Sequence, residues 1–336
     1  IHCTLFQERH RQLQPKFTPK QPGELKIFWV GASKAQDESG FLQALNRLGQ
    51  VKFFYNVIEP PSDNYSYQNW LLESINITNA SVLILDVRDG LSKEVIQQVK
   101  EITNIKIVSI DDPEEKRLSA DLLFYPPVLQ LKQMNWEGFN GDLKSGWEYV
   151  LLRKEFLIDY ERSLTNYTNI IVSMGATDPL NMTSFVLNSL LKLNEVFHVT
   201  IILGDGNKFK DDLEIQLSKT DLNYSILVNP LKIAEVFSQS DFAIISFGQT
   251  AYELAALKIP AIYICLTADH EESSKIFSKN NIGYNAGQFK KIKMTILAKN
   301  ILEFIRNRNK LHIMKKSFSF LNISDMSKIS KKIINI

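Results

Sequence analysis

The sequence predicts an α/β protein with two domains, each built on a parallel β-sheet that is covered by helices. One observation is length, because 336 residues suit two cores of about 150 residues better than a single core. The other is the alternation of short apolar, β-branched runs with amphipathic stretches along most of the chain. This alternation is typical of βαβ units, whose strands are buried on both faces.

The first series of strands starts at Leu25. Its predicted strands are LKIFWVG, VKFFYN, SVLILDV, KIVSIDD and ADLLFYPP, and its helices include GFLQALNRLG and SKEVIQQVKEIT. Residues 1–24 lack the apolar core and cleavage site of a signal peptide, and we expect them to be a flexible leader. The first domain is therefore predicted to cover residues 25–143.

The second series follows a glycine-containing stretch without periodicity, residues 128–148, which is the predicted domain junction. Its strands are NIIVSMG, HVTIILGDG, YSILVNP, DFAIISFG and PAIYICL. We expect the second domain over residues 144–290 and helices over 291–336, the last crossing back to the first domain. Ligands of such sheets bind beyond the carboxyl ends of the strands, so the predicted site is a cleft that both domains face.

The composition excludes several classes of protein. The 39 basic and 37 acidic residues leave a net charge of +2, which gives no support for nucleic acid as a partner. No apolar run approaches the ~20 residues that span a bilayer. Cys3 and Cys265 lie far apart, which indicates a buried thiol in a reducing compartment and not a disulfide framework. We therefore expect a cytoplasmic protein.

Basic residues concentrate near the C-terminus. Between residues 308 and 332 a single acid, Asp325, stands against Arg308, Lys310, Lys315, Lys316, Lys328, Lys331 and Lys332. A solvated helix face explains these charges more simply than contact with lipid phosphate or an anionic glycan. Membrane contact is thus left without support.

Two turns of the second domain could approach a phosphate. In VSMGATDPLNMTSFV, Gly175 frees the backbone, and Thr177 or Asp178 can cap a helix with Pro179 at its first position. Such a helix end offers N–H groups to an anion, although many turns are capped in this way for structural reasons. In ILGDGN, which contains Gly204, the full dinucleotide-binding spacing is absent, so a flexible turn explains it equally well.

A third turn lies in FGQTAYELAALKIPA. Gly248, Gln249 and Thr250 stand at the positive end of a predicted helix, where backbone donors suit a phosphate. Glu253 follows three residues after Thr250. A capping box, in which Thr250 and Glu253 bind each other's backbone N–H groups, explains this stretch equally well when it is taken alone.

A fourth element favours ligand binding. In LTADHEESSKIF, the residues Asp269, His270 and Glu271 begin a helix at the same edge of the sheet. His270 is the only one of the five histidines that we place at such a strand end. The sequence has no His/Cys cluster with metal-ligand spacing, so neither a metal nor a cofactor is predicted.

The order of these motifs resembles the UDP-sugar hydrolase family of pseudaminic acid biosynthesis. More distantly, it is similar to the glycosyltransferase that adds N-acetylglucosamine to the peptidoglycan lipid precursor. The resemblance runs from Val82 to Asn285 and rests on VLILDVRDG, KIVSIDD, ADLLFYPP, SGWEYVLLRKEF, IIVSMGATDPLNMT, SDFAIISFGQTAYELAALKIPAIYICLTADHEES and IGY. It implies the GT-B architecture, two Rossmann-like domains facing an interdomain cleft, with the donor bound mainly by the C-terminal domain.

The resemblance also implies roles for single residues. Glu253 would accept hydrogen bonds from the ribose hydroxyls, which suits an ionised carboxylate. The other implied contacts of the nucleotide sugar are with diphosphate, sugar or the cleft, and they involve Gly175, Ala176, Gly248, Gln249, Thr250, Asp269, His270 and Glu271. Gly204 is a further candidate at this edge.

The resemblance fails where the chemistry is expected. The first turn, GASKAQDESGFLQALNRLG, lacks the histidine that the hydrolase family uses as its base, and Val87 follows Asp86 where the family has another histidine. Loss of a general base forfeits ~10²–10⁴ in rate. The acids near the predicted cleft are Asp37, Glu38, Asp86 and Asp89. Partial burial can raise the pKa of a carboxyl enough for it to act as a base. A solvated loop with helix caps explains Asp37 and Glu38 more simply. Asp86, at the end of a buried strand, is therefore the better candidate and Asp37 the second.

Three hypotheses for the function follow. The first is a GT-B glycosyltransferase that uses a UDP-linked sugar and an unidentified acceptor in surface-glycan or nonulosonic acid-related metabolism. The second is a hydrolase of the pseudaminic acid type whose base is an acid such as Asp86. The third is a protein that binds a nucleotide sugar without catalysis.

Overall fold

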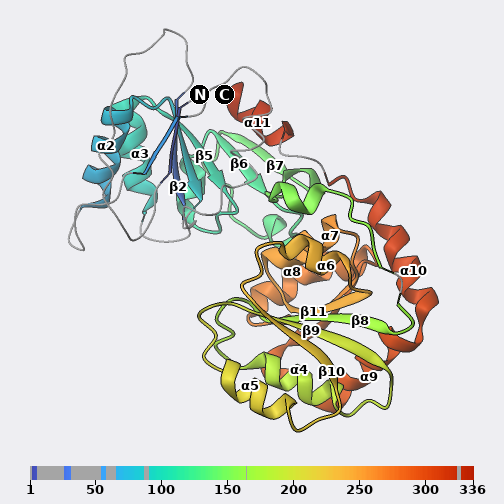
Figure 1. The fold of residues 1–336 in the computed structure, drawn as a ribbon. Coiled ribbons are helices and arrows are strands. Elements are labelled where there is room, and N and C mark those ends of the chain that lie inside the picture. Colours follow the sequence, from blue (N-terminus) through green and yellow to red (C-terminus); the bar gives the residue numbers. More distant parts are fainter. Residues whose placement is uncertain are drawn as a thin grey trace. The chain divides into compact units, whose positions relative to one another are not determined.

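The chain forms two compact units. The computed structural model describes residues 2–5, 26–31, 54–57, 66–86, 91–163, 165–323 and 327–336. One unit comprises Ile1–Arg153 with Ile323–Ile336, and the other comprises Lys154–Asn322 (Figure 1). Each unit is built around a parallel sheet.

The first unit contains a seven-stranded sheet of order β3-β1-β2-β4-β5-β6-β7, in which every described pairing is parallel. Its strands are β1 (His2–Leu5), β2 (Lys26–Gly31), β3 (Phe54–Val57), β4 (Val82–Asp86), β5 (Lys106–Ile110), β6 (Leu122–Tyr125) and β7 (Asp142–Ser145). The apolar residues of β4 through β6 are buried, as expected for central strands that helices cover on both faces.

Two strands of this sheet differ from the sequence-based expectation. Strand β1 lies within residues 1–24, where we expected a leader, and it pairs with both β2 and β3. Strand β7 lies within the stretch 128–148 that we took for the domain junction, and it pairs with β6. The sequence DLKS of β7 is mostly polar because this edge strand is largely exposed, so it carries no apolar pattern.

Two helices of the first unit begin after a serine. Ser66 caps α2 (Tyr67–Thr78), and Ser92 caps α3 (Lys93–Thr103). Short 3₁₀ turns follow at η1 (Glu115–Ser119), η2 (Leu129–Lys132) and η3 (Trp147–Tyr149). The last helix, α11 (Ser327–Ile334), returns to this unit and buries Ile329 and Ile333. The predicted helix over residues 40–49 lies outside the described residues.

The second unit contains a six-stranded parallel sheet of order β10-β9-β8-β11-β12-β13. The strands are β8 (Thr168–Ser173), β9 (Phe197–Leu203), β10 (Asn223–Val228), β11 (Phe242–Ser246), β12 (Ala261–Cys265) and β13 (Gly283–Gln288). The chain builds outward from β8 in one direction and from β11 in the other. The boundary between β8 and β11 is therefore the switch point at which ligands of such sheets bind.

Helices cover both faces of this second sheet, with α6, α7 and α8 on one side and α4, α5 and α9 on the other (Figure 1). Their bounds are η4 (Lys154–Leu157), α4 (Met182–Leu190), α5 (Lys210–Leu217), α6 (Ile233–Ser238), α7 (Gln249–Ala256), α8 (Ala268–Lys279), η5 (Phe289–Lys291), α9 (Met294–Arg306), α10 (Arg308–Ser317) and η6 (Phe318–Phe320). One apolar cluster joins β8, β9 and β11 to α4, α5 and α9.

Cys265 is a free, fully buried thiol at the end of β12. Burial raises the pKa of this thiol to about 11, so it stays protonated near neutral pH. None of the helices in the described part of the chain combines the length and the apolar character needed to cross a bilayer.

Candidate functional site

The candidate site lies at the carboxyl ends of the second sheet, where the turns after β8, β9, β11 and β12 meet. Gly175, in the turn after β8, is exposed and has a φ of +84°, a left-handed conformation that favours glycine. A Cβ at this position would lie 3.8 Å from the Ser246 Oγ at the end of β11. The turn after β8 thus lies directly beside the switch point.

The start of α4 corrects an expectation. The helix begins at Met182 and not at Pro179, because Asp178 and Asn181 both adopt positive φ angles and give the chain an additional turn. The buried carboxylate of Asp178 accepts hydrogen bonds from the backbone N–H groups of Met182 at 2.8 Å and Thr183 at 2.9 Å. An internal anion therefore occupies this helix end, which was expected to offer those N–H groups to a ligand.

Gly204, in the turn after β9, has a packing role. A Cβ on Gly204 would lie 2.4 Å from the carbonyl oxygen of Ala176 and 2.8 Å from its Cβ. Glycine is required here so that the turns after β8 and β9 can touch. Asp205 and Asn229 then link the turns after β9 and β10 by a hydrogen bond of 2.9 Å.

The start of α7 differs from that of α4. Its N-cap is Gly248, which has no side chain with which to cap the helix. Thr250 is the second residue of the helix and not its N-cap, so it does not hold the position that a capping box with Glu253 requires. Gly248 has an extended φ of 170°, and a Cβ there would meet nothing within 4 Å. Neither backbone geometry nor packing requires glycine at this position.

Glu253 is the fifth residue of α7 and only 7% exposed. Tyr252 of this helix and Phe247, just before it, pack with Tyr263 and Phe277 in an aromatic cluster whose contacting ring centroids lie 5.1–6.3 Å apart. A carboxylate at such depth is costly unless polar donors compensate its charge. Glu253 lies one turn after the N-terminus of α7.

The start of α8 lies beside that of α7. The Thr267 Oγ1 caps α8 by accepting the backbone N–H of His270 at 3.1 Å, and the His270 ring centroid lies 6.2 Å from that of Phe247. Glu271 is held by β13, because its Oε2 accepts a hydrogen bond of 2.7 Å from the Gln288 Nε2. Asp269 is exposed at the same helix end.

The structure thus brings the second-domain candidates together at one sheet edge, and it also reveals two neighbours that the sequence analysis missed. Ser246 faces Gly175 across the switch point, and Gln288 holds Glu271. Ser246 is a polar residue at the end of an apolar run, and this position could have identified it from the sequence as a site residue. No sequence pattern pointed to Gln288, because it contacts a residue 17 positions away.

The catalytic candidates belong to the first unit. Asp86 ends β4, has an exposed side chain and pairs in register with Gly31 of β2. Asp37, Glu38 and Asp89 lie outside the described residues. The nucleotide-binding candidates belong to the other unit.

A buried ion pair lies at the carboxyl edge of the first sheet, the edge at which Asp86 also lies. Asp112, just after β5, lies 3.4 Å from the Lys116 Nζ, and neither side chain is exposed. Its carboxylate also accepts the Ser109 hydroxyl at 3.1 Å and the Glu114 backbone N–H at 2.9 Å. Burial raises the pKa of Asp112, and these partners counteract the rise. A pair sealed from solvent in this way has a structural role.

Within the described residues no group of His, Cys, Asp and Glu is arranged to hold a metal ion. No protein-family model matches the chain.

Three curated proteins resemble the sequence. The chain is 26% identical over 215 residues to an uncharacterized protein of Methanocaldococcus jannaschii, with 60% of this chain and 43% of that protein covered. It is 25% identical over 212 residues to the UDP-2,4-diacetamido-2,4,6-trideoxy-beta-L-altropyranose hydrolase of Campylobacter jejuni, with 62% and 75% covered. It is 18% identical over 240 residues to the spore coat polysaccharide biosynthesis protein SpsG of Bacillus subtilis, with 69% and 68% covered. The resemblance drawn from the motifs is confirmed.

Solved structures share the architecture along nearly the whole chain. MurG of Acinetobacter baumannii has a TM-score of 0.62 at 10% identity, covering 100% of this chain and 99% of its own. The UDP complex of Staphylococcus aureus MnaA has a TM-score of 0.63 at 12% identity, covering 99% and 95%. Identities this low establish the fold alone, and the two-domain Rossmann-like GT-B fold is confirmed. The sequence match to the Methanocaldococcus jannaschii protein covers less than half of that protein's length.

Proposed function

We propose that this protein is an enzyme acting on a nucleotide sugar, with a UDP-linked donor bound at the carboxyl edge of the second sheet. The leading reaction is transfer of the sugar to an acceptor hydroxyl, as in a GT-B glycosyltransferase. The observation that carries the proposal is Gly248 at the start of α7. Its glycine is explained by neither φ nor packing, and close approach of a diphosphate to the backbone explains it.

The start of α7 is the best diphosphate site at this edge. Asp178 occupies the start of α4, and Thr267 caps α8, whereas the N-cap of α7 is a glycine without a side chain. A helix N-terminus carries roughly half a positive charge. It can stabilise the diphosphate as the sugar bond breaks, which is the electrostatic contribution that such a reaction needs.

Glu253 is proposed to bind the ribose. Its nearly buried carboxylate offers acceptor sites for two vicinal hydroxyls, and bonds from hydroxyls to an ionised acceptor are short and strong. Gln249 and Thr250 would contribute at the diphosphate, and Asp269, His270 and Glu271 at the diphosphate and sugar. The exposed Gly175 and Ala176 would border the sugar from the turn after β8, with Gly204 holding that turn in place.

Asp86 is the proposed base that activates the attacking hydroxyl, with Asp37 as the second candidate. Asp86 lies at the carboxyl end of β4, the edge at which sheets of this kind act. An acceptor hydroxyl as nucleophile gives transfer, and water as nucleophile gives hydrolysis.

Hydrolysis is the second candidate function. It is favoured by the sequence match to a curated UDP-sugar hydrolase over 212 residues. Release of free sugar and UDP from a UDP-sugar, with no acceptor present, would distinguish it from transfer. Tight UDP binding without turnover of any donor would instead indicate a protein that binds without catalysis.

The first test is calorimetric titration with UDP, CDP and GDP. We expect selective UDP binding that weakens about tenfold or more in Glu253→Gln, because the amide loses the ionised acceptor. The matched control is Glu235→Gln on α6, where the side chain is exposed in an ion pair with Lys232 and affinity should stay within about twofold.

Each outcome bears on a different part of the proposal. Selective binding of CDP or GDP would retain the site and change the donor class. No binding of any of the three nucleotides would contradict the proposed site, and equal binding by Glu253→Gln would remove the ribose role of Glu253.

A further inference from the structure

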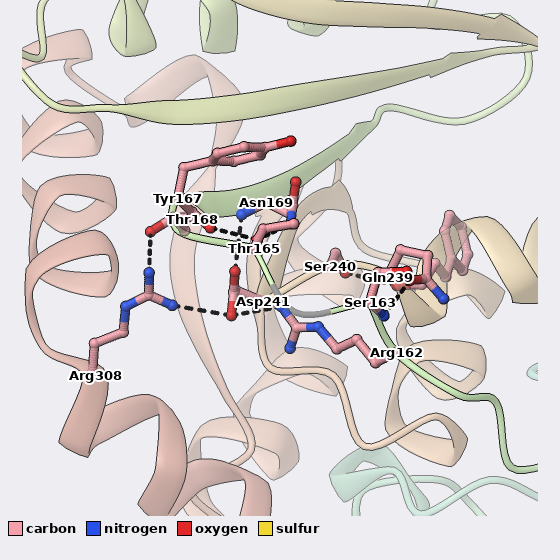
Figure 2. Close-up of polar contacts among 11 residues, drawn as sticks. Arg162, Ser163, Thr165, Tyr167, Thr168, Asn169, Gln239, Ser240, Asp241 and Arg308 are labelled. Atoms are coloured by element: carbon pink, nitrogen blue, oxygen red, sulfur yellow. Dashed lines mark hydrogen bonds and ion pairs between the residues drawn. The ribbon is translucent and has the colours of Figure 1, made fainter.

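The edge of the second sheet opposite the proposed donor site contains a cluster of charges around Asp241. Asp241 directly precedes β11, next to the start of β8, and is 6% exposed (Figure 2). Its Oδ2 accepts the backbone N–H of Asn169 at 2.9 Å. Its Oδ1 is shared by two guanidinium groups, with Arg162 Nη2 at 2.7 Å and Arg308 Nη1 at 3.2 Å. One carboxylate thus serves two arginines.

A third cation lies on the helix that carries Arg308. Lys315 lies seven residues after Arg308 on α10 and therefore on the same helix face. Burial lowers the pKa of the Lys315 ammonium, the charges of Arg162 and Arg308 lower it further, and Asp241 only partly offsets them. None of the ion pairs in the described part of the chain includes Lys315, and residues 308–323 contain no acid. The three cations and one carboxylate leave a local surplus of two positive charges.

The chain segment that carries Arg162 is held in place without the excess positive charge. Uncharged contacts already hold the segment, because Gln239 accepts the Ser163 backbone N–H at 3.0 Å and donates to the Glu161 carbonyl at 2.9 Å. Like charges held close together repel one another, and an anion between them relieves the repulsion. The two excess positive charges therefore favour the binding of an anion in addition to Asp241.

We propose that Arg162, Arg308 and Lys315 bind a phosphate group at this edge of the sheet. Asp241 and the Thr168 hydroxyl, 3.0 Å from Arg308 Nη2, fix the arginine forks, so little side-chain entropy is lost when an anion binds. The Arg162 and Arg308 side chains remain 28% and 55% exposed and keep N–H groups for further bonds. A phosphate dianion carries the charge that balances the cluster, and this site is independent of the proposed donor site.

The test is titration of the full chain with inorganic phosphate by calorimetry. We expect saturable binding that weakens about tenfold or more in Lys315→Met, the usual effect of losing a charged hydrogen bond. Lys316→Met, an exposed neighbour on the same helix, should bind within about twofold of the wild type. Absence of saturable binding, equal affinity in Lys315→Met, or equal weakening in both variants would overturn the proposal.

A second measurement does not depend on the folding of Lys315→Met. Reductive ¹³C-methylation keeps lysine charges, and Lys315→Arg identifies the Lys315 resonance by its disappearance. Saturable movement of that resonance with phosphate is expected, and an unchanged resonance would contradict the site.

A lipid headgroup offers the same phosphate chemistry as a soluble anion. Sedimentation with phosphatidylglycerol and with phosphatidylcholine vesicles distinguishes these two sources of the phosphate. If the protein sediments with phosphatidylglycerol vesicles only, and Lys315→Met does not, the site binds a lipid phosphate. If the protein binds inorganic phosphate but sediments with neither vesicle, the site binds a soluble phosphate.

Discussion

At the scale of single residues, glycines at the edge of the second sheet differ in what they do. Gly175 is required by its left-handed backbone, with a φ of +84°, and Gly204 by its contact with Ala176. Gly248 meets neither requirement. A glycine that the fold does not need is the stronger indication of a ligand.

Alanine substitutions separate these roles. In Gly248→Ala we expect an unchanged midpoint of thermal unfolding and UDP binding that weakens about tenfold or more, since the methyl group takes the space of the diphosphate. In Gly204→Ala we expect a loss of about 1–3 kcal/mol in the free energy of unfolding, because the Cβ overlaps Ala176. Calorimetry and denaturant unfolding measure the two effects. Unchanged UDP affinity in Gly248→Ala would remove the diphosphate from this helix end.

At the scale of elements, both sheets use the same device before a central strand. Asp121 precedes β6 and exchanges two hydrogen bonds with Ile107, through its own N–H at 2.8 Å and its carboxylate at 2.9 Å. Asp241 precedes β11 and exchanges the same pair with Asn169, at 2.8 and 2.9 Å. The side chain extends the ladder by one pair, which helps to fix the register of the parallel strands.

The carboxylate of Asp178 has a different role, because it caps the start of α4. Asp178→Ala removes both acceptors of the N–H groups at the start of α4 and should lower the free energy of unfolding by about 1–3 kcal/mol. Asp178→Asn should lose less, because the amide keeps one acceptor and tolerates the left-handed backbone of this position. Denaturant unfolding of both variants gives the order. Equal stability of Asp178→Ala and the wild type would show that the carboxylate is not needed as a cap.

The elements also show what the sequence could predict. Buried strands such as β4 and β11 are apolar up to their last residue, so their pattern is local and predicts the strands correctly. Strand β13, GYNAGQ, is half-buried and polar and therefore has no such pattern. The start of α4 depends on the left-handed turns at Asp178 and Asn181, which overrode the capping pattern around Pro179. The pairing of Arg308 with Asp241 joins residues 67 apart, a contact that no local pattern contains.

At the scale of the whole molecule, the chain divides the proposed function between its units. The candidates for nucleotide-sugar binding, from Gly175 to Glu271, all lie in the unit Lys154–Asn322, and Asp86 lies in the other unit. The second unit has its own six-stranded sheet and its own apolar core. A unit of this size with a separate core is able to fold alone.

Expression of residues 154–322 as a fragment tests that division. We expect cooperative thermal unfolding, because the fragment keeps the sheet, its helices and the Asp241 contacts. UDP affinity should stay within about threefold of the intact protein if the donor contacts reside in this unit, while turnover of UDP-sugars should be lost together with Asp86. The control is the same fragment with Glu253→Gln, which should lose affinity as it does in the full chain. A fragment that unfolds cooperatively and yet binds no UDP, when the intact protein does, would show that the first unit contributes essential donor contacts.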